Sequence, residues 1–304
     1  MHCRRWRSRD EREATPVSPT HEPAALWPLL VCQRHRLPSQ LERSFRLELG
    51  AGLLCQRYIL GCPARAIAAE QLLPLVRDLG MPISAEQVQA TLLPHLQRAS
   101  TVYLGYEQAA SGDSHRLYFE YWDEVVQRLS ALPAVEIEGW CAGHRPRWEM
   151  GVGYKWPIGH ASQGAAELYT TAYQVQPMLP KSEMLMQAEA VLGIAGVPAD
   201  LRLLVQALLQ AIVQHSPGID PVFLEVAEAD SPRRSFDLSV HRLELSLQDL
   251  EPWLNPLICR FLGHSHGLRD CLHGAAPQAC LTHISAGCSR RGFPFCCVYY
   301  DPSP

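Results

Sequence analysis

The sequence predicts an α+β fold, a closed ten-stranded antiparallel β-barrel made of five hairpins and surrounded by α-helices. Two observations lead to this prediction. Segments that alternate between apolar and polar residues occur in pairs, and stretches with helical spacing separate the pairs. An open sheet of that many strands would leave exposed edges, whereas closure into a barrel removes them.

Each pair of alternating segments reads as a hairpin with turn residues such as Ser111-Gly112-Asp113 between its strands. The expected strands span residues 45–49 with 56–60, 101–107 with 115–122, 150–156 with 167–175, 222–227 with 234–241, and 280–285 with 293–300. The turns recur at loosely regular intervals, which indicates a repeat of one hairpin plus one or two helices.

Helical spacing fills the intervals between the hairpins. The expected helices span residues 65–78, 84–97, 123–132, 181–192, 199–215 and 246–262. Ser84 and Gln87 form a capping-box pattern, and Pro180 and Pro198 are placed at or just before helix starts.

Alternation along the strands assigns an apolar face to the helices and a polar, aromatic face to the barrel interior. In 115–122, for example, Leu117 and Phe119 alternate with Arg116 and Tyr118. In 150–156, the apolar set Met150, Val152, Tyr154 and Trp156 opposes Gly151, Gly153 and Lys155. A barrel of eight strands is about filled by its side chains, so ten strands leave room for a ligand.

The residues expected inside the barrel are basic and aromatic. They include Arg46, Arg57, Arg116, Lys155 and His241, together with Tyr118, Trp122, Tyr169, Tyr173 and Tyr299, and Glu48 is the notable carboxylate. Arg, Lys and Tyr side chains suit a diphosphate, because they donate hydrogen bonds to its oxygens. Aromatic faces stabilise an allylic carbocation and shield it from water, and a carboxylate can accept the released proton.

Five hairpin-plus-helix units with Arg, Lys and Tyr at alternate strand positions resemble the aromatic prenyltransferases of the ABBA class, and among them the cyanobactin-type peptide prenyltransferases. The segments Phe45-Arg-Leu-Glu-Leu49 and Arg57-Tyr-Ile-Leu60 are similar to the first hairpin of that family. Ser114-His-Arg-Leu-Tyr-Phe119 is similar to the second, and Glu167-Leu-Tyr169, Pro221-Val-Phe223 and Val298-Tyr-Tyr300 to the later units. The resemblance covers about residues 40–301.

This resemblance implies transfer of a dimethylallyl or geranyl group from its diphosphate to an electron-rich side chain of a peptide, in macrocyclic form for this family. Glu48 would be the catalytic base. The implied diphosphate-binding residues are Arg57, Arg116, Lys155, Tyr118, Tyr173, His241 and Tyr299, and the implied prenyl and acceptor pocket consists of Trp122, Tyr169, Phe223 and His283.

Two alternatives stay open: an aromatic small-molecule acceptor, and a non-catalytic barrel that binds an anionic ligand or a peptide. Asp237 and Ser239 stand where many members of the class place Lys, Arg or Tyr, and Cys297 stands where a basic residue is expected. Because of these departures, a non-catalytic barrel stays an open alternative.

Net charge and hydropathy exclude some classes of binding partner. The formal net charge is -4 with a pI near 6.3, so the chain has no global attraction for nucleic acid or anionic membranes. The most apolar stretch is shorter than the roughly 20 residues that a membrane-spanning helix needs. We therefore expect neither nucleic acid nor membrane as a partner, and a monomer.

The 11 cysteines include no CxxC pair, which indicates a reducing, cytoplasmic environment. Residues 1–25 are expected to form a disordered leader and 26–304 a single domain. No residues are predicted to ligate a metal and no cofactor is expected to be tightly bound, although Mg²⁺ can accompany the diphosphate.

Overall fold

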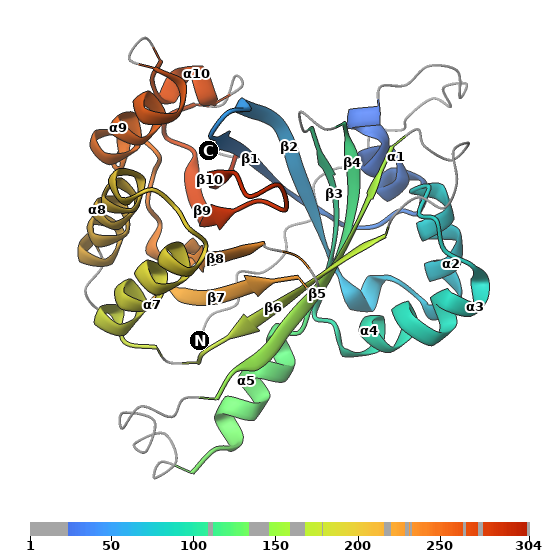
Figure 1. Cartoon of the computed structure of the whole chain (residues 1–304). Coiled ribbons are helices and arrows are strands. Elements are labelled where there is room, and N and C mark those ends of the chain that lie inside the picture. Colours follow the sequence, from blue (N-terminus) through green and yellow to red (C-terminus); the bar gives the residue numbers. More distant parts are fainter. Residues whose placement is uncertain are drawn as a thin grey trace.

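The strands follow one another around a closed antiparallel barrel in the order β1-β10-β9-β8-β7-β6-β5-β4-β3-β2, as the computed structural model shows (Figure 1). Their bounds are β1 Gln40–Glu48, β2 Gly52–Pro63, β3 Thr101–Glu107, β4 Ser114–Glu120, β5 Trp148–Pro157, β6 Tyr169–Val175, β7 Val222–Ala227, β8 Arg234–Ser239, β9 Cys280–Cys288 and β10 Pro294–Asp301. The predicted closed ten-stranded barrel of five hairpins is confirmed.

The structure describes residues 24–108, 112–133, 146–158, 168–177, 179–215, 220–228, 231, 233–263, 266–272 and 276–302. The predicted leader, 1–25, falls outside these ranges except for Ala24 and Ala25, which begin the short helix η1. Three predicted turns also fall partly or wholly outside these ranges, at residues 111, 159–164, and 230 and 232.

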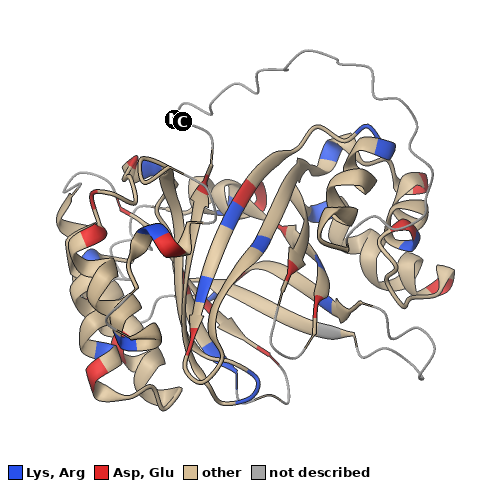
Figure 2. Cartoon of the chain, turned by 90° about the horizontal axis from the view of Figure 1, so that it is seen from above, with Lys and Arg blue, Asp and Glu red and all other residues tan. Residues whose placement is uncertain are grey.

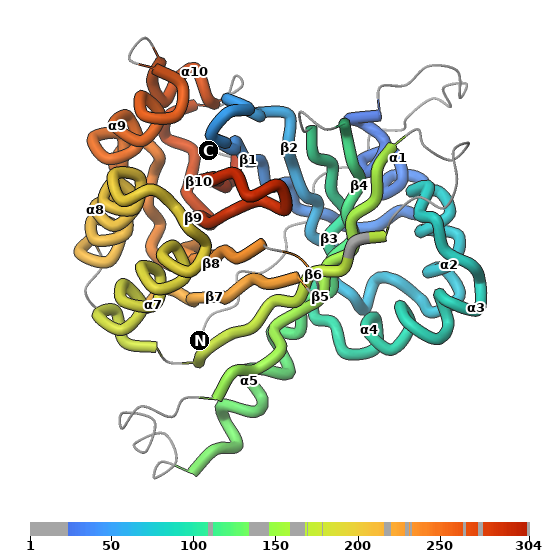
Figure 3. The backbone as a smooth tube through the Cα atoms, viewed as in Figure 1, coloured from blue at the N-terminus to red at the C-terminus, as the bar shows by residue number. Residues whose placement is uncertain are grey.

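Closure depends on the pairing of the first strand with the last, which Figure 3 shows as adjacent blue and red tubes. Ser44 lies opposite Tyr299, and Arg46 lies opposite Cys297. All five hairpin turns connect odd strands to the following even strands, so they gather at one end of the barrel, here named the hairpin end. The links that carry helices leave from the opposite end, here named the helix end.

The helices lie outside the barrel. Their bounds are η1 Ala24–Leu26, α1 Trp27–Arg34, η2 Ala64–Ala66, α2 Ala69–Asp78, α3 Ala85–Gln87, the π-helical η3 Val88–Leu92, α4 Leu93–Arg98, α5 Trp122–Ala131, α7 Lys181–Ile194, α8 Ala199–His215, η4 His241–Leu243, α9 Glu251–Leu262 and α10 Leu268–Cys271. None of the described helices is long and apolar enough to cross a membrane.

Local signals account for several helix ends. The predicted capping box forms, because Ser84 Oγ accepts from the Gln87 amide at 3.2 Å and Gln87 Oε1 accepts from the Ser84 amide at 2.9 Å. The last predicted helix begins later than expected, at Glu251 instead of residue 246. Ser246 instead pairs with Cys280 in a β-bridge, and its hydroxyl donates to Asp249 at 2.7 Å in a tight turn.

Three apolar clusters fix the helices to the barrel. One joins α7, α8, α9 and α10 to the outer faces of β1 and β7–β10, and the second joins α1, α2, η3 and α4 to the outer faces of β2–β5. The third packs α5 against Trp148, Met150, Val175 and Leu224 at the helix end, below β5 and β6 in Figure 1. The outer face is therefore apolar, as the alternation predicts.

Met150 departs from its expected outward position. The register between β5 and β6 shifts between Glu149 and Gly151, and this β-bulge places Met150 beside Gly151 on the cavity wall. Val152 and Tyr154 beyond the bulge keep the predicted outward orientation.

Gly287 on β9 is a site where packing requires the absence of a side chain. A Cβ there would lie 2.1 Å from the carbonyl oxygen of Arg234 on the neighbouring strand β8. Gly287→Ala should therefore lower the free energy of unfolding by about 1–3 kcal/mol, measured by urea denaturation. Gly193→Ala in α7 is the matched control, since its Cβ would meet no atom closer than 3.5 Å and alanine favours the helix. Equal stability of the two variants would contradict this packing.

Candidate functional site

The barrel encloses a cavity of about 130 Å³. Its aromatic and apolar lining consists of Tyr103, Tyr118, Tyr173 and Tyr299 with Ile59, Phe119, Met150, Leu224 and Val226. Its charged and titratable lining consists of Arg116 and Arg233 with Glu42, Glu120, Asp237 and His283. The wall thus combines ring faces with ionisable groups of both signs.

A cluster of cations surrounds the buried carboxylate of Glu107, the last residue of β3. Lys155 Nζ lies 3.0 Å from Glu107 Oε2, Arg57 Nη2 lies 3.5 Å from Oε1 and Arg46 Nη1 lies 3.9 Å from Oε1. Arg116 also forms an ion pair with Glu107. We name Arg46, Arg57, Arg116 and Lys155 the cation cluster. Blue segments on the barrel strands in Figure 2 mark Lys and Arg positions.

The cation cluster carries more positive charge than its carboxylates balance. Glu107 and Glu48 are its bonded acidic partners, the latter 2.5 Å from Arg46, so four cations face two carboxylates. The Nε atoms of Arg46, Arg57 and Arg116 are buried and have no hydrogen-bond partner. Buried donors without acceptors are rare in folded proteins and require an explanation. An anion bound within the cluster would supply the missing acceptors.

The surplus of positive charge affects the pKa of Lys155. Burial, followed by the charges of Arg116, Arg46 and Arg57, lowers the pKa of Lys155 well below its usual value. A polyanion placed among these groups would reverse the repulsion and favour the protonated amine. The cluster is therefore arranged to bind negative charge.

Tyrosines form the wall next to the cation cluster. Tyr118 Oη accepts a hydrogen bond from Arg116 Nη1 at 2.7 Å, and the rings of Tyr118 and Tyr173 meet edge to face with centroids 5.8 Å apart. Gly153 makes room for this arrangement, because a Cβ there would lie 2.3 Å from the Tyr118 ring. Burial raises the pKa values of Tyr173 and Tyr299, so both hydroxyls stay neutral donors.

A second ion cluster lies where the β7–β8 and β9–β10 turns meet at the hairpin end. Glu228 accepts from Arg233 Nη1 at 2.5 Å, from Arg290 Nη2 at 2.8 Å and from Thr171 Oγ1 at 2.9 Å. Arg233 belongs to this cluster and also lines the cavity.

The cavity wall toward the helix end is acidic. Burial raises the pKa of Glu42 to about 7 and also raises the pKa of Glu120, whose Oε2 accepts from the Tyr103 hydroxyl at 3.2 Å. Burial opposes the charge of His283, but the carboxylates of Asp237 and Glu42 raise its pKa to about 9. His283 Nδ1 donates to Asp237 Oδ1 at 2.7 Å. The lumen is thus polarised, with cations at one end and carboxylates at the other.

The structure brings together most of the residues predicted for the site. Arg57, Arg116 and Lys155 belong to the cation cluster, and Tyr118, Tyr173, Tyr299 and His283 line the cavity. Tyr169 lies on β6, but its side chain is outside the described part of the structure. Asp237 and Cys297, which depart from the family pattern, both form hydrogen bonds here. Asp237 binds His283, and the Cys297 thiol accepts from Arg57 Nη1 at 2.8 Å.

Four predicted residues lie elsewhere. Phe223 faces outward and stacks on Phe236 in the cluster beneath α7 and α8, so its expected place in the pocket is corrected. Trp122 is the first residue of α5 and packs in the third apolar cluster, since β4 ends at Glu120. His241 lies on η4 beyond the end of β8 and contacts His283, not the cation cluster.

Glu48 is the fourth. Its carboxylate binds Arg46, and it is not among the residues that line the cavity.

Several site residues escaped the sequence analysis. Glu107 ends a strand in which Tyr103, Gly105 and Glu107 alternate with apolar residues, so the same period-two reading could have placed it inside. The alternation of β4 does place Glu120 on the inward face with Arg116 and Tyr118, and only its role could not be predicted. Arg233 precedes β8 and had no strand pattern to indicate its direction.

No family model matches the chain, and no curated protein matches it. Among solved structures, it is similar to AnaPT from Neosartorya fischeri, with a TM-score of 0.45 and 9% identity over 86% of this chain and 77% of that one. It is also similar to NotF prenyltransferase, with a TM-score of 0.46 and 12% identity over 86% and 80%. For NotF in complex with brevianamide F and DMSPP the values are 0.45 and 11% over 86% and 79%. Likeness at this level does not establish function, which we argue from the chain's own residues.

The Glu228 cluster should make stability depend on pH. Burial opposes ionisation, yet Arg290 and Arg233 lower the pKa of Glu228 to about 2. A depressed folded-state pKa stabilises the protein above the unfolded-state value near 4.5, and this contribution is lost as the pH falls toward 2. Glu228→Gln should therefore reduce the free energy of unfolding by on the order of 3 kcal/mol at pH 7. The difference from the parent should shrink at pH 3, and a pH-independent difference in urea denaturation would contradict the ion-pair assignment.

Proposed function

We propose that the chain is a prenyltransferase that moves a prenyl group from its diphosphate to an electron-rich acceptor. The observation that carries this proposal is the cation cluster with its three unbonded Nε atoms beside a cavity walled by tyrosines. A diphosphate supplies the acceptors that these guanidinium groups lack, and the ring faces suit the allylic cation left after ionisation.

The reaction begins with heterolysis of the bond between C1 of the prenyl group and the diphosphate oxygen. The bonding electrons leave with the diphosphate, and the cation cluster stabilises the charge that develops on it. Tyr118, which accepts a hydrogen bond from Arg116, lies between the cluster and the ring wall. Tyr118, Tyr173 and Tyr299 shield the cation from water.

The cavity volume favours a five-carbon donor. A buried apolar cavity of about 150 Å³ accommodates benzene. The space of about 130 Å³ in this barrel is therefore comparable to the volume of one dimethylallyl group. A ten-carbon geranyl chain would require side chains to move.

An electron pair of the acceptor forms the new bond to C1 of the cation, and the proton that the acceptor then releases goes to Glu120. This carboxylate lines the cavity away from the cation cluster, the Tyr103 hydroxyl orients it, and burial raises its pKa toward the range in which a general base works well. Glu48, in contrast, is neutralised by Arg46.

Mg²⁺ fits the diphosphate end poorly. In the described part of the chain, the carboxylates beside the cations are Glu48, Glu107 and Glu228, and each already binds Arg or Lys. Mg²⁺ prefers free oxygen ligands in octahedral geometry. The arginines and Lys155 therefore balance the diphosphate charge without the metal.

The proposal also specifies the class of acceptor molecule. The sequence resemblance favours an aromatic side chain of a peptide, and the cavity that holds the prenyl group is too small to enclose such a side chain as well. The acceptor then approaches from the acidic, helix end of the barrel. A small aromatic molecule is the alternative, and the two are assayed side by side.

Arg116→Ala should reduce prenyl transfer by on the order of 10²-fold or more, because it removes a charge-assisted contact to the leaving group. The measurement is intact-mass spectrometry of aromatic peptides and small aromatic acceptors incubated with dimethylallyl diphosphate and, separately, geranyl diphosphate. Arg34→Ala, which removes the exposed partner of Asp78, is the matched control and should leave transfer unchanged.

Transfer by Arg116→Ala at the parental rate would remove the diphosphate assignment. If the parent binds a non-hydrolysable prenyl diphosphate in isothermal titration but transfers to no acceptor, the alternative of a non-catalytic anion-binding barrel is favoured instead.

Glu120→Gln should lower transfer by on the order of 10²-fold with little change in donor affinity, since the amide keeps the shape but cannot accept the proton. Glu48→Gln tests the other glutamate: it removes the partner of Arg46 and so can shift donor affinity, but transfer from the bound donor should stay near the parental rate. The reverse pattern would make Glu48 the base, as the sequence analysis expected.

A further inference from the structure

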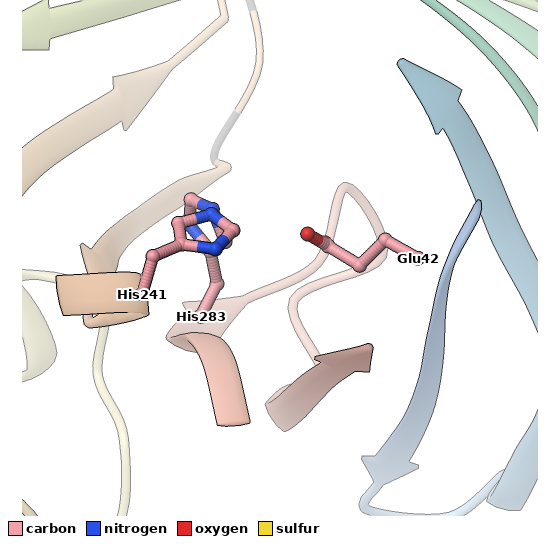
Figure 4. Close-up of side chains that lie close together, drawn as sticks. All are labelled: Glu42, His241 and His283. Atoms are coloured by element: carbon pink, nitrogen blue, oxygen red, sulfur yellow. The ribbon is translucent and has the colours of Figure 1, made fainter. Parts of the chain in front are cut away.

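Three potential metal ligands converge at the helix end of the barrel. Glu42 of β1, His241 of η4 and His283 of β9 each offer one ligand atom, and these atoms lie within 4.8 Å of one another. Figure 4 shows the Glu42 side chain extended from its strand toward the two imidazole rings. The three residues come from distant parts of the sequence, so only barrel closure assembles them.

The orientation of the imidazoles suits ligation. His283 Nδ1 donates to Asp237 Oδ1 at 2.7 Å, which leaves His283 Nε2 facing the centre of the group. His241 Nε2 and His283 Nε2 are hydrogen-bonded to each other at 2.8 Å, and an ion bound here would take the place of the proton that they share. A carboxylate that fixes one imidazole nitrogen while the other binds the ion is the usual outer partner in metal sites.

One oxygen of the carboxylate at this place is left without a hydrogen bond. Glu42 Oε1 is buried without a hydrogen bond, and so is Thr282 Oγ1 of the adjacent β9 residue, which is 4% exposed. The Lys and Arg residues that line the cavity are Arg116 and Arg233, and both belong to the ion clusters described above. A buried carboxylate oxygen needs a cation or a donor. The Thr282 hydroxyl and the His283 imidazole are the nearest such groups, and an ion held between Glu42 and the two imidazoles would add the contact that Oε1 lacks.

We propose that Glu42, His241 and His283 bind a divalent transition metal ion, with Zn²⁺ the best match, and that Asp237 is the outer partner of His283. Two imidazoles and one carboxylate are a common zinc ligand set, whereas Mg²⁺ and Ca²⁺ select oxygen ligands. Ligands about 2 Å from a tetrahedral ion lie roughly 3.4 Å apart, so a small rotation of the exposed His241 ring completes the site.

A tetrahedral ion held by three side chains keeps one open position. Glu42 and His283 line the cavity, so that position faces the acceptor end of the lumen. There the ion can bind a water molecule or a heteroatom of a bound molecule. Metal binding is measured without any substrate, so its outcome does not depend on the proposed prenyl transfer.

The test uses the full chain, stripped with a chelator, equilibrated with Zn²⁺ and dialysed, with bound metal counted by mass spectrometry. The expected result is one tightly bound Zn²⁺ that is lost in His241→Ala and Glu42→Gln. Asp237→Asn should weaken binding by about 10- to 100-fold, the usual effect of losing an outer partner. His215→Ala, an exposed histidine at the end of α8, is the matched control and should bind as the parent does.

Cobalt substitution separates this site from the free cysteines of the chain. Co²⁺ bound here should show ligand-field bands without thiolate charge-transfer absorption in the near ultraviolet, because the ligands are nitrogen and oxygen. His241 is exposed, so its alanine variant should fold, as circular dichroism will check. Absence of Zn²⁺ binding by the parent, unchanged binding by folded His241→Ala, or a thiolate spectrum would each overturn the proposal.

Discussion

The pairing of β1 with β10 is the constraint on which the rest of the structure depends. It converts a row of hairpins into a barrel with an inner face that the described helices contact only at the helix end, where α5 packs against Met150 and Leu224. The outer face is apolar because two helix clusters cover it, so every second strand residue is available for the lumen. Without this closure, β1 with Arg46 would be an exposed edge strand, where water would solvate its charge.

Closure also produces a polar gradient inside the barrel. The cation cluster and Glu107 lie at one end, and Glu42, Glu120 and Asp237 lie toward the other, with tyrosine rings between them. Like charges held together in a buried space repel one another, and Glu107 offsets only part of that repulsion. The same arrangement that destabilises the free lumen orients charge toward an anion before it binds, which lowers the reorganisation that binding requires.

Period-two alternation was sufficient to predict the barrel, because each strand has one face against helices and one against the lumen. It placed Arg116, Tyr118 and Lys155 correctly. It failed where strands end or bend: Trp122 follows the end of β4, and Met150 sits at a bulge that no local pattern announces. Phe223 was assigned by resemblance, but β7 turns its more apolar face, with Leu224 and Val226, to the cavity, and Phe223 packs outward in the cluster beneath α7 and α8.

Which side chain each inward carboxylate binds determines whether it can act as a base, and most of these pairings could not be predicted from the sequence. Glu48 and Glu120 are both strand glutamates that point inward, yet Arg46 neutralises the first, while a hydroxyl is the hydrogen-bond partner of the second. The pair of Arg46 and Glu48 is local, because the two residues are two positions apart on β1, whereas the neutral neighbours of Glu120, Thr101 on β3 and Gly151 on β5, are fixed by the register across strands. A carboxylate between residues without charge keeps its basicity, and this is why the acidic end of the lumen, and not Glu48, is suited to accept a proton.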